Sequence, residues 1–125
     1  MTKETSPMVT TDPMHARLNL FAEPYEVAPG VLMHPSFVNT YAVRTPAGLL
    51  CVDPGFRHAA DAVHAAVRKW SDAPLHTAVY THGHVDHAFG LKAFLEAGDR
   101  PQIIAQENCP ERFRRYHLTL SLIHI

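Results

Sequence analysis

The chain has 125 residues, 46% of them hydrophobic and 18% charged, which allows the packed core of one small domain or of part of a larger one. Its net charge of −1 disfavours a nucleic-acid partner, because phosphate neutralisation needs a cationic surface. No apolar run is long enough to span a bilayer, and two cysteines cannot form a disulfide-rich scaffold.

The first 17 residues are polar and carry Pro7 and Pro13, so we expect a flexible leader over 1–17. Lys3 is followed by polar residues rather than by an apolar stretch, which argues against a secretory signal and favours a cytoplasmic protein.

Short apolar segments separated by turn residues predict strands in the next part of the chain. Residues 31–33 follow a Pro-Gly pair, and residues 37–44 are rich in β-branched and aromatic side chains. The apolar run 49–52 predicts a strand covered on both faces, and Asp53-Pro54-Gly55 ends it.

The pattern then changes to helical spacing. Residues 57–70 predict a helix with one buried stripe of four side chains: Ala59, Val63, Val67 and Trp70. Further strands are expected over 77–80 and 102–105, and further helices over 91–97 and 110–117. Strands that alternate with helices predict an α/β layered domain.

The segment from Thr81 to His87 contains the pattern His-x-His-x-Asp-His. The composition of this chain predicts only about 0.003 chance matches to that pattern, so the chain's ten histidines do not explain it. Neutral imidazole and carboxylate are common ligands of zinc and its first-row neighbours.

The spacing of these residues suggests two metal ions. In extended chain, His82 and His84 point to the same side and can bind one ion together. The adjacent Asp86 and His87 fall where a strand gives way to a helix, so a turn can direct both at a second ion. Gly83 would let the backbone pass close to the site.

Two segments together resemble the motifs of the metallo-β-lactamase-fold hydrolases. The first is the apolar strand 49–52 with Asp53 and Gly55, and the second is the histidine pattern with its preceding strand 78–81. The resemblance covers residues 25–117 and implies the amino-terminal part of an αββα sandwich.

This resemblance also implies roles for five residues. His82 and His84 would hold the first metal, Asp86 and His87 the second, and Asp53 would support the metal loop by hydrogen bonding. Asp86 would also be catalytic. The implied cofactor is zinc, with two ions in the full-length protein, although iron and manganese suit the same donors.

The chemistry that the resemblance implies is hydrolysis of a small-molecule ester, thioester, sulfate ester or amide by a metal-bound hydroxide. The stretch 88–118, with Ile103, Ile104 and the pair Glu107-Asn108, is similar to the alkyl-sulfatase-like branch. In that branch acidic residues after the strand can join the metal site, but Glu107 equally suits a solvated helix start.

Three alternatives stay open at this stage: an iron-dependent persulfide-dioxygenase-like member of the same fold, a nucleic-acid-processing member, and a non-catalytic truncated remnant. Metal content and oxygen uptake would separate the first from a hydrolase. Binding of RNA that depends on salt would support the second, against the near-neutral charge. The sequence leaves the substrate and the oligomeric state open.

Members of this family need further ligands after the histidine pattern, so we expect a truncated domain over 18–119 that is poorly stable and nearly inactive alone. Residues 120–125 end on apolar side chains and resemble a non-native tail or the start of a further strand. His117 lies among arginines and is expected on an exposed helix face rather than as a ligand.

The remaining histidines and cysteines fit structural roles. Cys51 is expected in the core, and Cys109 has no ligand-like spacing or nearby base that would make a nucleophile. His34, His58 and His64 are expected at the surface.

Overall fold

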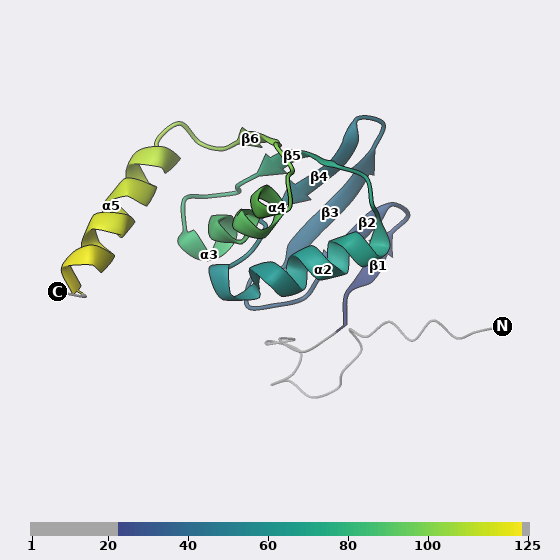
Figure 1. Ribbon diagram of the computed structural model, residues 1–125, viewed down its shortest axis with the longest axis horizontal. Coiled ribbons are helices and arrows are strands. Elements are labelled where there is room, and N and C mark those ends of the chain that lie inside the picture. The colour runs from purple at the N-terminus through teal and green to yellow at the C-terminus, as the bar shows by residue number, and fades with distance from the viewer. Residues whose placement is uncertain (1–22, 124–125) are drawn as a thin grey trace.

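In a computed structural model, which describes residues 23–123 and their side chains as far as residue 118, six strands form one sheet (Figure 1). They are β1 (Tyr25–Ala28), β2 (Val31–His34), β3 (Thr40–Thr45), β4 (Gly48–Val52), β5 (Leu75–Val79) and β6 (Gln102–Ile104). The strands lie in sequence order across the sheet. Strands β1 to β4 pair antiparallel, whereas β4–β5 and β5–β6 pair parallel.

Each parallel pair is joined through helices, as parallel pairing requires. The 3₁₀ turn η1 (Arg57–Ala59) and helix α2 (Ala60–Trp70) connect β4 to β5. The connection from β5 to β6 contains α3 (Val85–Ala88), η2 (Phe89–Leu91) and α4 (Lys92–Glu96). Helix α5 (Cys109–Ile123) follows β6, and Figure 1 shows it to the side of the sheet while α2 and α4 lie over one face. The expected α/β layering is confirmed.

The core lies between this face of the sheet and the helices. Val63 and Val67 of α2 are fully buried, as the helical spacing predicts, and Phe94 of α4 is buried beside them. Ala59 and Trp70 pack at the edge of the same core. Burying side chains of this size contributes about 1.5–3 kcal/mol each to stability.

Two strand predictions need correction. The predicted strand 37–44 begins only at Thr40, because Ser36 donates its backbone N–H to the Asn39 side chain (3.4 Å) in a turn that leaves Phe37 72% exposed. Strand β4 is not covered on both faces: Leu49 and Cys51 are buried, whereas Leu50 and Val52 are only partly buried. The helices α2 and α4 cover one face, so the burial alternates.

Other boundaries shift by a few residues. Strand β5 begins at Leu75 rather than residue 77, and α5 continues to Ile123, so residues 120–123 are helical and not a strand. The expected leader over 1–17 lies outside the described residues, and the native or non-native origin of 120–125 stays a prediction. Over residues 23–123, the structure contains no helix that is long and apolar enough to cross a membrane.

His64 also departs from its expected surface position. Its ring packs edge-on against Phe94, with ring centroids 4.8 Å apart, and its Nε2 is buried. The helical spacing places His64 one residue after Val63, on the flank of the buried stripe. His58, by contrast, is exposed as expected.

We predict that stability falls at alkaline pH through Cys51. Burial raises the pKa of this thiol from 9.0 to about 12, so above pH 9.0 the unfolded chain loses a proton that the folded chain keeps. The free energy of unfolding should therefore fall as the pH rises towards 12, by up to about 1.4 kcal/mol per pH unit. Urea denaturation of the native chain and of Cys51→Ala should show a shallower decline in the variant. Equal slopes would contradict this assignment.

Candidate metal centre

The residues of the histidine pattern follow the carboxyl end of β5. His82 lies in the bend after the strand, and His84 has an extended backbone (φ −87°, ψ 140°) immediately before α3. Asp86 and His87 lie within the first turn of α3. The helix begins where the sequence predicts it, but residues 81–83 form a bend rather than the expected extended chain, and only His84 is extended.

The three imidazoles lie together. The ring centroids of His82 and His84 are 4.6 Å apart, and those of His82 and His87 are 4.0 Å apart. His82 and His84 are exposed, whereas His87 and Asp86 are partly buried. The histidines thus form one cluster that is open to solvent on the side of His82 and His84.

Asp53 connects this cluster to the end of β4. Its carboxylate accepts the His87 Nδ1–H at 2.8 Å, the Thr81 backbone N–H at 2.8 Å and the Thr81 hydroxyl at 2.6 Å. The Asp53 residue is only 6% exposed. A buried carboxylate needs such donors, and here they all come from the histidine segment.

The backbone of Asp53 adopts an unusual conformation. It is the only non-glycine residue with positive φ (50°) among those the structure describes. Its N–H donates to the Val79 carbonyl (2.9 Å), and its own carbonyl accepts the Thr40 hydroxyl (2.7 Å). Left-handed backbone costs an L-residue about 1–3 kcal/mol and persists where surrounding bonds hold it. In this conformation the Asp53 carboxylate hydrogen-bonds to Thr81 and His87.

A close backbone contact between Gly90 and Pro54-Gly55 also joins the histidine segment to the turn after β4. Gly90 donates its N–H to the Gly55 carbonyl at 2.8 Å, and a Cβ on Gly90 would lie 2.1 Å from the Pro54 oxygen. Only glycine permits this approach. The end of β4 therefore contacts the histidine segment through both backbone and side chains.

Nitrogen and oxygen atoms of this cluster are of the types that bind divalent metals. The Nδ1 atoms of His82 and His87 are engaged by Thr81 and Asp53, which leaves each Nε2 available. The His87 Nε2 and the Asp86 Oδ2 are 3.9 Å apart. No group of three His, Cys, Asp or Glu side chains among the described residues has the arrangement to hold one ion. Catalytic zinc sites use three protein ligands, so neither predicted pair forms a complete catalytic site by itself.

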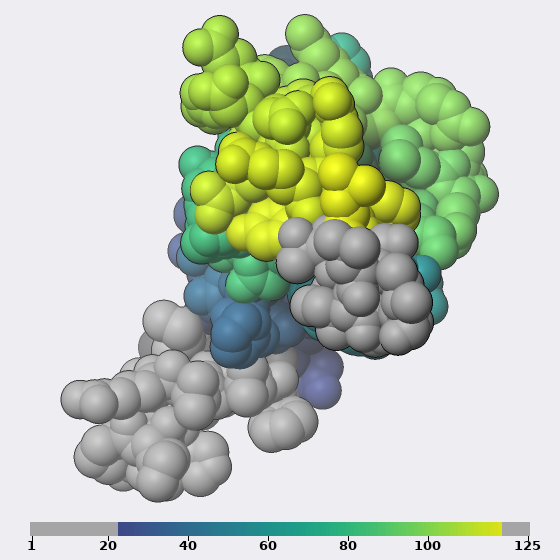
Figure 2. All heavy atoms as spheres, turned by 90° about the vertical axis from the view of Figure 1, so that its left-hand side faces the viewer, coloured from purple at the N-terminus to yellow at the C-terminus, as the bar shows by residue number. Residues whose placement is uncertain are grey.

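Helix α5 lies beside the cluster, which the sequence did not indicate. The Phe113 ring packs against Tyr80 and Phe89, with centroids 6.0 and 5.3 Å away. A Cβ on Gly83 would meet the Arg112 side chain at 2.8 Å, so the close neighbour at Gly83 is this helix. Figure 2 views the molecule from this side and shows α5, in yellow, across the middle of the face.

Other residues considered from the sequence do not join the cluster. Glu107 and His117 are exposed, consistent with solvated positions. Cys51 and Cys109 are buried free thiols. Because burial raises the pKa of Cys51 to about 12, this residue stays a neutral thiol and cannot serve as a nucleophile at neutral pH.

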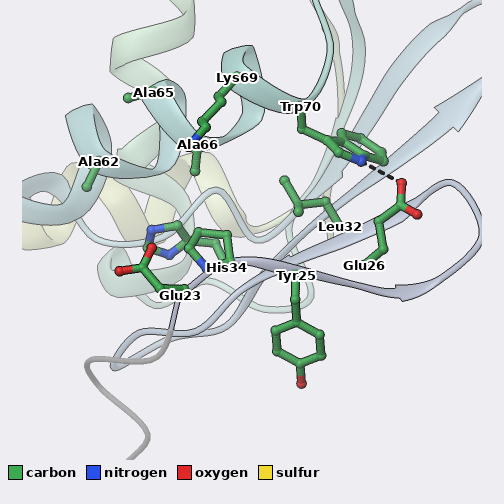
Figure 3. Close-up of a pocket in the computed structure, with 11 residues that line it drawn as sticks. Glu23, Tyr25, Glu26, Leu32, His34, Ala62, Ala65, Ala66, Lys69 and Trp70 are labelled. Carbon is green, nitrogen blue, oxygen red and sulfur yellow. Dashed lines mark hydrogen bonds between the residues drawn. The ribbon is translucent and has the colours of Figure 1, made fainter. Parts of the chain in front are cut away.

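A cavity of about 610 Å³ lies elsewhere, between the β1–β2 hairpin and α2 (Figure 3). His34 lines it, together with Lys69 and Trp70, and the Trp70 indole N–H donates to Glu26 (2.6 Å). His34 is half-buried rather than a surface residue as expected, and burial lowers the pKa of its imidazole. None of the five residues predicted for the metal site lines this cavity.

Comparison with known proteins assigns the family. A family model described as the metallo-beta-lactamase superfamily matches residues 34–123, which include both the Asp53 turn and the histidine pattern. The chain belongs to this superfamily. The resemblance that the two motifs indicate is therefore confirmed.

Individual relatives agree with this assignment. A metallo-beta-lactamase of Cronobacter sakazakii with a HARLDQ motif superposes with a TM-score of 0.67 at 19% identity, covering 82% of this chain and 40% of that one. A subclass B3 metallo-beta-lactamase of Bradyrhizobium japonicum gives 0.54 at 20% identity, covering 64% and 32%. These likenesses establish the fold.

A linear primary-alkylsulfatase of a Pseudomonas strain is 44% identical over 54 residues, which are 42% of this chain and 10% of that protein. This relative agrees with the branch that the sequence suggests. The chain thus spans about 40% of the first solved relative and a tenth of this curated one.

We predict that Asp53→Asn keeps the fold but weakens metal binding. Asparagine tolerates left-handed backbone, yet its amide cannot accept all three hydrogen bonds. Zinc affinity measured by titration calorimetry should fall about 10- to 100-fold. The exposed Asp72→Asn is the matched control and should bind zinc as the native chain does. Equal affinities in the two variants would refute the supporting role.

We also predict that Gly90→Ala destabilises the chain by about 1–3 kcal/mol, because the new methyl group meets the rigid Pro54 carbonyl. The control is Gly83→Ala, where the methyl group meets the flexible Arg112 side chain, which can move aside. Urea denaturation should give a clearly larger loss for Gly90→Ala. A larger loss for Gly83→Ala would show that the Gly90 contact is not a constraint.

Proposed function

We propose that this chain supplies the first metal ligands of a metal-dependent hydrolase that acts on sulfate esters of small organic molecules. The observation that carries the proposal is the cluster of three imidazoles, whose closest rings lie 4.0 Å apart, beside a buried carboxylate. Membership of the metallo-beta-lactamase superfamily supports the same reaction class.

The ligands fall into two pairs. His82 and His84 would hold one ion, and Asp86 and His87 would hold the other, with donors from outside the described residues completing each shell. Zinc suits these donors, and iron or manganese would be accepted as well. When bound, such ions lower the pKa of water and stabilise negative charge that develops on an ester oxygen.

The chain's own residues prepare this chemistry. Asp53 holds the His87 ring by its Nδ1–H, so that Nε2 carries the lone pair. Asp86 is the proposed catalytic carboxylate, because it lies within the cluster and its side chain is 27% exposed, accessible to water. The exposed His82 and His84 leave the same side open to a substrate.

The sulfate-ester class rests on one relative, since the protein that shares 44% identity over 54 residues is a linear primary-alkylsulfatase. The metallo-beta-lactamases among the relatives are below 25% identical and support the fold alone. A net charge of −1 also favours a small molecule over a nucleic acid as the partner.

Metal binding tests the site directly. Zinc added to the purified chain should bind, and His82→Ala or Asp86→Ala should weaken it at least about tenfold. His117→Ala removes an exposed histidine outside the cluster and serves as the control. Elemental analysis of the protein as purified distinguishes zinc from iron. Zinc affinity that is equal in all three variants would overturn the proposal.

Substrate class needs a separate assay. Because the chain spans only part of its relatives and holds incomplete ligand pairs, the assay uses the longest native polypeptide that contains it. With zinc bound, that polypeptide should release inorganic sulfate from a linear primary alkyl sulfate faster than it hydrolyses a carboxylate ester or a β-lactam, and His84→Ala should abolish the sulfate release. Preference for the β-lactam would refute the sulfate-ester assignment.

A further inference from the structure

Thr81 lies between the buried carboxylate and the exposed part of the histidine cluster. Its hydroxyl is 2.6 Å from Asp53 Oδ2 and 3.0 Å from His82 Nδ1. Its backbone N–H also donates to Asp53 Oδ1 at 2.8 Å, which anchors the residue independently of the hydroxyl. The Thr81 side chain thus links Asp53 to His82 by two hydrogen bonds, whereas His87 hydrogen-bonds Asp53 and meets His82 through a ring contact.

The direction of these hydrogen bonds follows from the chemistry of the groups. A carboxylate only accepts, so the Thr81 hydroxyl must donate its single proton to Asp53. The hydroxyl then offers a lone pair to His82, whose Nδ1 must carry the proton. The same carboxylate oxygen accepts the Nδ1–H of His87 at 2.8 Å. Both rings are therefore held with Nδ1 protonated and Nε2 free.

We propose that Thr81 is a positioning residue which transmits the hydrogen-bonding preference of Asp53 to His82 and so selects the imidazole tautomer that binds metal through Nε2. This role of Thr81 rests on the proposed metal site, but the tautomer of His82 can be measured without metal. Threonine suits the task because its branched Cβ restricts χ1 and keeps the hydroxyl between its two partners.

The test compares three variants. Thr81→Val keeps the branched shape and the backbone N–H but removes the hydroxyl, so His82 Nδ1 loses its acceptor. Thr81→Ser keeps the hydroxyl. Thr45→Val is the matched control, because the Thr45 hydroxyl donates to the Gly48 carbonyl in the β3–β4 turn, a contact that involves no histidine.

The first readout is nitrogen-15 NMR of the histidine side chains in the metal-free chain. In Thr81→Val the His82 signals should move away from the Nδ1-protonated pattern while those of His87 stay, and Thr81→Ser should restore the native pattern. A His82 tautomer that is unchanged in Thr81→Val overturns the inference. So does a Thr81→Ser spectrum that matches that of Thr81→Val.

The second readout is zinc affinity, which should fall about 10- to 100-fold in Thr81→Val and stay close to native in Thr81→Ser and Thr45→Val. If the native chain binds no zinc, the proposed function fails, and the tautomer result still decides the role of Thr81. If zinc binds but Thr81→Val binds it equally well, the positioning role fails and the metal site stands.

Discussion

One buried carboxylate connects the two loops that make the site. Asp53 is 6% exposed, and its three hydrogen bonds go to the histidine segment, at Thr81 and His87. An ionised group in this position is costly without donors, so the loop after β5 must stay where it supplies them. The same hydrogen bonds also orient the imidazole of His87. The stability of the turn at Asp53 and the orientation of this imidazole therefore depend on one carboxylate.

The sheet determines which chemistry this part of the chain can offer. Strands β4 and β5 are parallel neighbours, so their carboxyl ends meet at one edge, where open α/β sheets place their ligands. The turn after β4 contributes the Asp53 carboxylate, and the segment after β5 contributes the clustered histidines. Helix α5 adds aromatic packing through Phe113 beside that segment.

Local patterns predicted the parts of the fold that depend on neighbouring residues. The helical stripe with Val63 and Val67 and most of the strands and helices follow from short-range spacing, whereas β1 and α3 were not predicted. The family was inferred from the resemblance of two motifs and is confirmed. The supposed double coverage of β4 failed because an apolar run does not reveal how many faces are covered. Thr81 and the contact of Arg112 with Gly83 could not be predicted, since each depends on segments brought together only by folding. The metal-binding role of the histidines stays a prediction.

The backbone bond from the Asp53 N–H to the Val79 carbonyl continues the β4–β5 ladder one step beyond Val52. Because side chains alternate between faces, a slip of β4 by a single residue would point the carboxylate away from the imidazoles while exposing Leu49 and Cys51. The alternating burial of apolar side chains along β4 therefore fixes the register that directs the Asp53 carboxylate towards the histidines. Substitutions that shift the register of β4 would therefore disturb the Asp53–His87 hydrogen bond even though they lie outside the cluster.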